Sequence, residues 1–61
     1  MMKPLDELIY RKCFATLWCD YRTDYGNVYR ILVDLNYRAT INADSDEEAI
    51  RIFEEGAWEN G

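Results

Sequence analysis

Hydrophobic and polar residues alternate through the middle of this chain, and the alternation predicts strands. Residues 9–21 (IYRKCFATLWCDY) are rich in aromatic and strand-favouring residues, and residues 28–33 (VYRILV) form a second run of the same kind. Residues 37–43 (YRATINA) alternate cleanly between apolar and polar positions. A period of two is typical of β-strands. Residues 24–27 suit a turn, whereas residues 34–36 either form a second tight turn or bend one long strand.

After the last of these runs the pattern becomes that of a helix. Ser45 and Glu48 have the spacing of a capping box, in which two side chains satisfy free N–H groups at a helix start. Gly56 stands where a helix-ending glycine is expected. The sequence therefore predicts an amphipathic helix over residues 46–55, with an apolar stripe formed by Ala49, Ile50, Ile52 and Phe53.

These elements predict an α+β fold: a small antiparallel meander of two to three strands, with one C-terminal amphipathic helix packed on one face. The 61 residues form a single domain, residues 1–61. Successive side chains of a strand point to opposite faces of a sheet, so odd and even positions separate. We expect the helix to cover the odd-numbered face, which carries Cys13, Ala15, Leu17, Cys19, Tyr29, Ile31, Val33, Leu35, Tyr37, Ala39, Ile41 and Ala43.

The even-numbered face is mixed, yet several of its side chains are too apolar for a surface that meets water alone: Phe14, Trp18, Val28 and Leu32. One helix covers one face of a sheet, so this second face is predicted to be an interface with a partner or with a second copy of the chain. The alternative is that Leu5, Leu8 or Trp58 folds over it.

Arginines on the same face raise the question of nucleic-acid binding. Arg30 and Arg38, beside Trp18 and Phe14, suit a sheet that stacks bases on aromatic rings. The formal net charge of −5 argues against this interpretation, because phosphate binding is favoured by a basic surface. We therefore expect no direct binding of nucleic acid.

The acidic residues gather at the C-terminal end of the chain. Residues 1–42 carry six basic and five acidic residues, whereas residues 43–61 carry one basic and seven acidic residues. An acidic helix attracts a basic protein surface and steers association with it. Because basic surfaces are often nucleic-acid channels, carboxylates can occupy the places of phosphates. The alternative is that these acids only keep the helix soluble; those on the predicted helix are Asp46, Glu47, Glu48, Glu54 and Glu55.

The sequence contains no signature of catalysis, metal binding or cofactor binding. Histidine is absent, and Ser45, the one serine, is already used as the helix cap. No nucleophile therefore has a neighbouring base. Residues 44–48 (DSDEE) are rich in oxygen ligands but lack the glycine and the later glutamate of a calcium loop. We expect a protein that is not an enzyme and that needs no cofactor.

The cysteines and the N-terminus indicate a soluble protein of a reducing compartment, the cytoplasm. Cys13 and Cys19 are six residues apart, which in a strand spans roughly 20 Å, too far for a disulfide. We expect both to be buried free thiols. The longest apolar run is far shorter than the roughly 20 residues of a membrane helix. The first ten residues, MMKPLDELIY, have acids where a signal peptide is apolar.

One segment resembles a known type of protein. The strand, cap and helix in YRATINADSDEEAIRIFEE (residues 37–55) resemble the strand-to-helix unit of very short phage proteins, among them the phage inhibitors of bacterial RNA polymerase. Small acidic anti-CRISPR proteins share the size and the charge. The resemblance implies an inhibitor, a DNA mimic, that occupies a nucleic-acid-binding site on a host enzyme such as a CRISPR effector or RNA polymerase. The alternative is a homodimeric structural or adaptor domain that associates through its sheet face.

Overall fold

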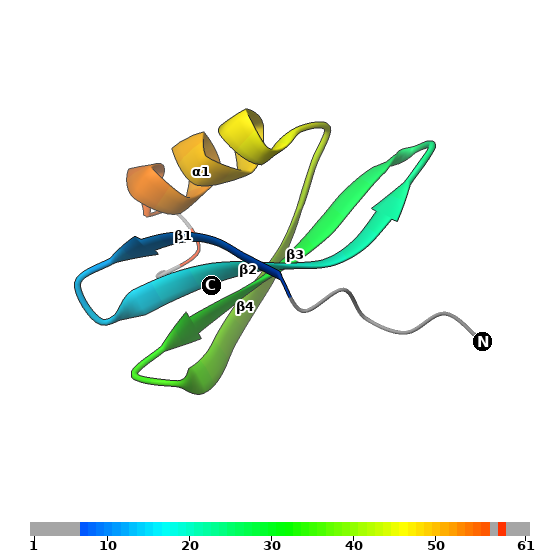
Figure 1. The fold of residues 1–61 in the computed structure, drawn as a ribbon. Helices are drawn as coiled ribbons and strands as arrows, with labels where there is room; N and C mark the ends of the chain where they lie inside the picture. The colour runs from blue at the N-terminus through cyan, green and yellow to red at the C-terminus, as the bar shows by residue number, and fades with distance from the viewer. Residues whose placement is uncertain (1–6, 57, 59–61) are drawn as a thin grey trace.

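The structure, a computed structural model, describes residues 7–56 and Trp58. Their strands form one antiparallel sheet in chain order, each strand paired with the next, and the helix follows the last strand (Figure 1). The elements are β1 (Glu7–Lys12), β2 (Ala15–Thr23), β3 (Gly26–Val33), β4 (Asn36–Ala43) and α1 (Asp46–Glu55). The predicted α+β meander with a C-terminal helix is confirmed, but the predicted number of strands, two to three, is too low, because the sheet has four.

Two reversals account for the difference. Residues 9–21 are not one strand, because the chain turns back at Cys13 and Phe14 between the paired residues Lys12 and Ala15. Cys13 has a φ of 56°. This left-handed conformation is disfavoured for most side chains, and turns that need it usually contain glycine or asparagine. The sequence has neither residue here, so nothing in it marks the turn. Residues 28–43 are likewise two strands rather than one bent strand.

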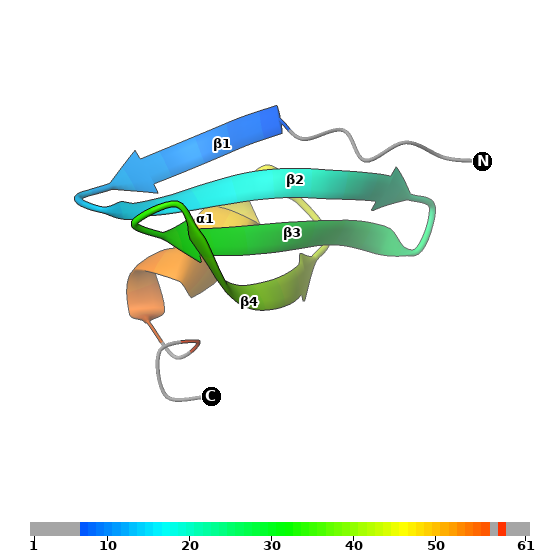
Figure 2. The same cartoon turned by 90° about the horizontal axis from the view of Figure 1, so that it is seen from below.

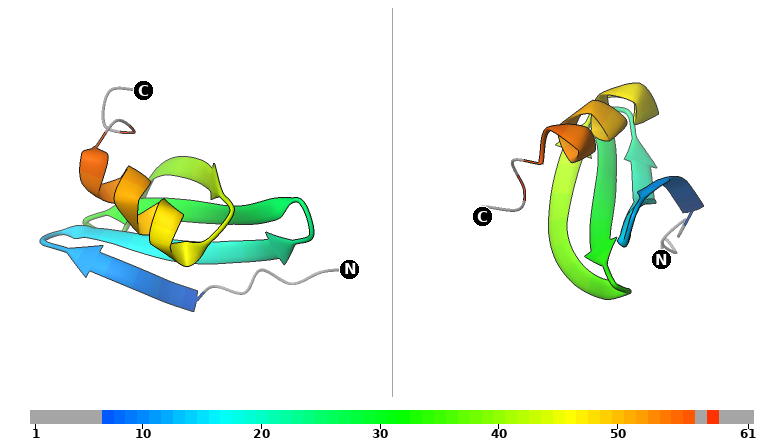
Figure 3. Two further views of the ribbon diagram at one scale, coloured as in Figure 1. Left: turned by 90° about the horizontal axis from the view of Figure 1, so that it is seen from above. Right: turned by 90° about the vertical axis from the view of Figure 1, so that its left-hand side faces the viewer.

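The hydrophobic core lies between α1 and the face of the sheet that the odd positions predict (Figure 3). Tyr29 and Ile31 in β3 are fully buried, as is Ala49 in α1. Burying apolar side chains is the main favourable term in folding. The odd-numbered face is confirmed as the core face for most of its residues. Among residues 7–56 and Trp58, the buried core is Leu17, Cys19, Tyr29, Ile31, Ala43, Ala49 and Phe53.

Three residues assigned to the core face are instead exposed: Cys13, Leu35 and Tyr37. Cys13 and Leu35 lie in turns, where the alternation of faces stops. A bulge at Arg38, between Tyr37 and Ala39, shifts the pairing of β3 with β4, so that Tyr37 lies opposite Leu32 on the second face. The prediction that both thiols are buried is thus correct for Cys19 and wrong for Cys13.

The helix begins and ends where the sequence predicts. The Ser45 hydroxyl accepts a hydrogen bond from the Glu48 N–H at 3.2 Å, and the Glu48 carboxylate accepts one from the Asp44 N–H at 3.1 Å. Gly56 ends the helix in the left-handed conformation, with a φ of 74°. Ten residues make α1 too short to cross a membrane, and none of the described helical residues belongs to a longer apolar span.

Phe53 fixes the C-terminal half of α1 to the sheet. Its ring meets the ring of Tyr10 in β1 edge to face, at a centroid distance of 5.8 Å. The ring of Trp58 lies parallel to it at 5.7 Å, and the Trp58 indole N–H donates to the Phe53 carbonyl oxygen at 2.9 Å. Trp58 therefore packs on the helix side, so the alternative in which it covers the second sheet face is wrong.

The second face of the sheet is left uncovered by α1, and Figure 2 looks onto this face with α1 behind it. Leu8 does not fold over the sheet; it belongs to β1, lies opposite Trp18, and is 48% exposed. Leu5 lies outside the described residues. Trp18, Val28 and Leu32 are half-buried among their neighbours in the sheet.

The two hairpin turns at one end of the sheet lie side by side, because the Asp34 N–H donates to the Phe14 carbonyl oxygen at 2.8 Å. The turn between β3 and β4 places both Asp34 and Leu35 in the left-handed region, with φ values of 57° and 67°. A two-residue hairpin turn of this kind favours Asn-Gly or Asp-Gly. Leu35 is 82% exposed, so it adopts this conformation without a compensating burial within the monomer.

We predict that Leu35→Gly raises the unfolding free energy by roughly 1 kcal/mol, because it removes the steric cost of a left-handed Leu. Leu35→Ala is the matched control, because it removes the same exposed side chain and keeps the cost. Urea unfolding of the three proteins measures the effect. Equal gains for Ala and Gly would show that the exposed side chain, and not the backbone, is unfavourable.

Candidate functional site: three surfaces

The structure places the predicted contact residues on three separate surfaces. The first is the start of α1, with Asp46, Glu47 and Glu48. The second is a hollow at the end of α1, where Glu54 and Glu55 meet Phe14. The third is the second sheet face, with Trp18, Arg30 and Leu32. The start and the end of α1 lie toward opposite ends of the sheet (Figure 1).

At the first surface, Asp46 joins the helix to the sheet. Its two carboxylate oxygens accept hydrogen bonds from the Arg22 guanidinium at 3.0 and 3.1 Å, and one also accepts from the Tyr29 hydroxyl. Asn27 donates to the Tyr29 oxygen at 2.9 Å, and Arg22 bonds Glu7 at 3.2 Å. The Asp46 carboxylate is thus engaged inside the monomer, in contacts to both β2 and β3.

These contacts shift the pKa values of the groups that make them. Burial and the hydrogen bond to Asp46 raise the pKa of Tyr29 to about 12. The hydrogen bonds from Arg22 and Tyr29 lower the pKa of Asp46 below its ordinary value. The folded protein therefore favours a neutral Tyr29 beside an ionised Asp46. Sequence reasoning missed this network, because Asp46 is 24 positions from Arg22 and 17 positions from Tyr29.

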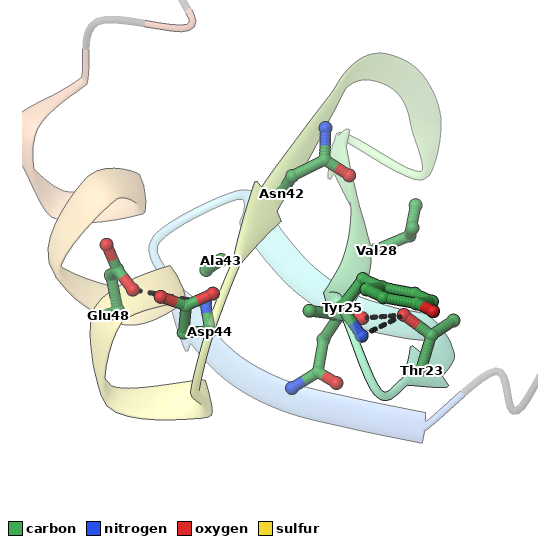
Figure 4. Close-up of a pocket in the computed structure, with 9 residues that line it drawn as sticks. Thr23, Tyr25, Val28, Asn42, Ala43, Asp44 and Glu48 are labelled. Atoms are coloured by element: carbon green, nitrogen blue, oxygen red, sulfur yellow. Dashed lines mark hydrogen bonds between the residues drawn. The ribbon is translucent and has the colours of Figure 1, made fainter.

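The two glutamates beside Asp46 differ in role. Glu48 closes the capping box and lies 3.8 Å from Arg51, whereas Glu47 is exposed. A hollow of about 260 Å³ lies between the β2–β3 turn and the start of α1. Figure 4 shows the residues that line it, with the hydrogen bond between Glu48 and Asp44 on one side. Its walls are mostly polar. Tyr25, at the tip of that turn, is 98% exposed.

The second surface brings together predicted residues that are forty positions apart in sequence. Phe14, Glu54 and Glu55 line one hollow of about 390 Å³ between the β1–β2 turn and the end of α1. Its remaining walls are Lys12, Cys13, Ala15, Val33, Phe53, Gly56 and Trp58. Sequence reasoning missed Lys12 and Trp58. The signal for Trp58 was Gly56, since a helix-ending glycine turns the following chain back over the last turn of the helix.

The charge at this hollow is unfavourable for the helix itself. The last turn of a helix carries partial negative charge and is stabilised by basic residues. α1 has no basic residue in its last turn and has Glu54 and Glu55 there instead. The Glu54 carboxylate raises the pKa of Tyr10, mainly through its negative charge. Among the described residues that line the hollow, Lys12 is the one basic residue, so these residues carry two negative charges and one positive charge.

The third surface mixes apolar side chains with an ion pair. Trp18 lies opposite Arg30 in the sheet, and its indole N–H donates to the Thr16 hydroxyl at 2.9 Å. The Arg30 guanidinium lies 3.2 Å from the carboxylate of Asp20, and both side chains are largely buried. Phe14, assigned to this face from its even number, lies in the turn and is 77% exposed.

The three surfaces offer charge and apolar contact. Within residues 7–56 and Trp58, no group of three carboxylate or thiol side chains could hold a metal ion. Comparisons with protein-family models, with curated proteins and with solved structures found no match to this chain.

The Tyr29–Asp46 contact predicts how stability depends on alkaline pH. The ordinary pKa of tyrosine is 10.0 and the folded value is about 12, so the unfolded chain releases its proton first. This contribution to stability is complete below pH 10 and is lost as the pH rises from about 10 to about 12. The measurement is urea unfolding at several pH values across this range.

Tyr29→Phe provides the comparison. At neutral pH it lowers the unfolding free energy by about 1 kcal/mol, because Asp46 loses a donor and Asn27 loses an acceptor. Above pH 10 its stability falls less steeply than that of the wild type. Tyr10, whose pKa is also raised, is present in both proteins and does not affect the comparison. Parallel curves for the two proteins would contradict the role given to Tyr29.

Proposed function

We propose that this chain is a non-enzymatic inhibitor that binds a basic surface of a host nucleic-acid enzyme through the outer face of α1. Its carboxylates take the places of phosphates, as the resemblance to anti-CRISPR proteins and to phage inhibitors of RNA polymerase implies. The partner is then an enzyme such as a CRISPR effector or RNA polymerase in the cytoplasm of a host bacterium.

One observation carries the proposal: the helix is fastened by one set of residues and leaves another set of acids exposed. Asp46 and Phe53 make the contacts to the sheet. Glu47, Glu54 and Glu55 are exposed. Glu54 also accepts a hydrogen bond from the Tyr10 hydroxyl of β1, whereas Glu47 and Glu55 are not among the residues that fasten the helix to the sheet. The docked helix thus presents negative charge at fixed positions. Binding therefore loses no conformational entropy to the ordering of the acidic segment.

The spacing of these acids supports a resemblance to a phosphate run. Glu47 and Glu54 are seven residues apart, or roughly 10 Å along a helix axis. That is about three steps of one strand of B-DNA, whose phosphates advance roughly 3.4 Å each. Arg51 lies between them in sequence and approaches Glu48, which reduces the negative charge at the centre of the helix and leaves it at the two ends.

A second candidate function is a homodimeric structural or adaptor domain joined through the second sheet face. The observation in its favour is that no element among the described residues covers this face, where Leu8 is 48% exposed. Against it, Trp18 and Leu32 are already half-buried within the monomer, so the apolar area left for a partner is modest.

The test of the first proposal is the double variant Glu54→Lys/Glu55→Lys, which changes the net charge from −5 to −1. Lysine suits the last turn of a helix, which offsets the loss of the hydrogen bond between Glu54 and Tyr10, so the variant stays folded. We expect its association with the partner, captured from a bacterial lysate and purified, to be about tenfold slower at low salt and to depend less on salt. Stopped-flow measurements over roughly 50–300 mM salt give both quantities.

Position is separated from net charge by two single variants. Glu55→Lys and Asp24→Lys make the same change in charge, but Asp24 lies in the β2–β3 turn, at the other end of the sheet. Only Glu55→Lys slows association markedly. Equal effects would mean that overall charge and not the helix attracts the partner. Wild-type protein that sediments as a dimer, with no change in either variant, would support the second candidate.

A further inference from the structure

We propose that the hollow at the C-terminal end of α1 binds an arginine side chain of the protein partner. This inference rests on the proposed function and gives it a specific point of contact. The hollow has a volume of about 390 Å³ and lies between the β1–β2 turn and the last turn of the helix. It is the surface on which Phe14, Glu54 and Glu55 come together.

Charge selects a cation for this position. Glu54 and Glu55 stand in the last turn of α1, where the helix dipole is already negative. No residue of that turn is basic, and Lys12 supplies one positive charge against two negative charges in the lining. A cationic group from outside therefore relieves a repulsion that the monomer leaves in place.

The rest of the lining favours arginine over lysine. Apart from Lys12 and the two glutamates, the lining residues are mostly apolar or aromatic. Among them, the rings of Phe53 and Trp58 stack at 5.7 Å, and the Trp58 N–H donates to the Phe53 carbonyl oxygen. Phe14 stands at the rim with 77% of its surface exposed. A guanidinium is planar and weakly hydrated, stacks on aromatic rings and bonds a carboxylate with two N–H groups at once. An ammonium is held more strongly by water and lacks the planar fit.

The β1–β2 turn supports the same conclusion. Cys13 adopts a left-handed conformation with a φ of 56°, and the adjacent Phe14 is directed away from the core. The hydrogen bond from the Asp34 N–H to the Phe14 carbonyl oxygen fixes this turn against the neighbouring one. The turn thus holds an exposed aromatic ring beside the acidic end of the helix. Such a ring is better suited to contact with a partner's arginine and the apolar residues next to that arginine than to contact with water.

The probe is the peptide acetyl-Gly-Arg-Leu-Gly-amide, with the same peptide containing lysine or citrulline as comparison. Citrulline has the shape of arginine without its charge. Heteronuclear NMR of the labelled protein follows the indole N–H of Trp58 and the amide of Gly56. We expect a saturable shift with millimolar affinity for the arginine peptide, binding at least about threefold weaker for lysine, and no saturable shift for citrulline.

Matched variants locate the contact. Glu54→Gln/Glu55→Gln weakens binding of the arginine peptide at least about threefold, whereas Glu47→Gln, at the start of the same helix, leaves it unchanged. Equal shifts with arginine and citrulline, or an equal effect of Glu47→Gln, overturn the proposal. So do shifts of the same signals with protein concentration alone, since these would assign the hollow to a second copy of the chain.

The outcomes also separate this inference from the function on which it rests. If the arginine peptide does not bind while Glu54→Lys/Glu55→Lys still slows association with the partner, the arginine site is wrong and the acidic helix remains the binding surface. If the peptide binds and the charge reversal leaves association with the partner unchanged, the hollow binds a guanidinium but the helix does not direct inhibition.

Discussion

The packing of α1 against one face of the sheet governs the rest of this structure. Phe53 inserts between Tyr10 and Trp58, and Ala49 is small enough to bring the helix close to the sheet. At the other end, Asp46 accepts hydrogen bonds from Arg22 and Tyr29. A chain of this length buries only about 60% of the surface that it exposes when unfolded, so it depends on this one core.

The same packing separates the residues that stabilise the fold from the residues that remain available to contact a partner. On α1, Asp46 and Glu48 are used at the helix start, in the bond to Arg22 and in the cap. Glu54 and Glu55 stand in the last turn, against the preference of the helix dipole. Residues that break a local preference are expected at functional sites, and the hydrogen bond from Tyr10 to Glu54 leaves the negative charge of that carboxylate in place. This distinction favours the end of the helix as the contact surface.

Sequence patterns predicted the features that depend on local chemistry. Ser45, Glu48 and Gly56 fix the helix bounds by capping, and alternation along the strands identified the buried face. The number of strands was not predictable in the same way. The turns at Cys13 and Leu35 place ordinary side chains in the left-handed region, where sequence statistics expect glycine or asparagine.

The candidate site was predicted only in part, because its geometry depends on contacts between distant segments. The acids and Phe14 were identified by type, but their meeting in one hollow follows from the β1–β2 turn, which the sequence does not mark. The network of Asp46 with Arg22 and Tyr29 follows from the crossing of α1 over β2 and β3. The bulge at Arg38 places Tyr37 on the other face of the sheet, and no local feature of the sequence signals it.

The most direct test of this account is the unfolding free energy of Phe53→Ala. Truncating a buried aromatic side chain costs about 3–5 kcal/mol, which equals the whole stability expected of a core this small. The account predicts that the variant does not fold, whereas Ile50→Ala, a half-buried neighbour on the same helix, remains folded. A Phe53→Ala protein that melts like the wild type would contradict the claim that this packing holds the helix and sheet together.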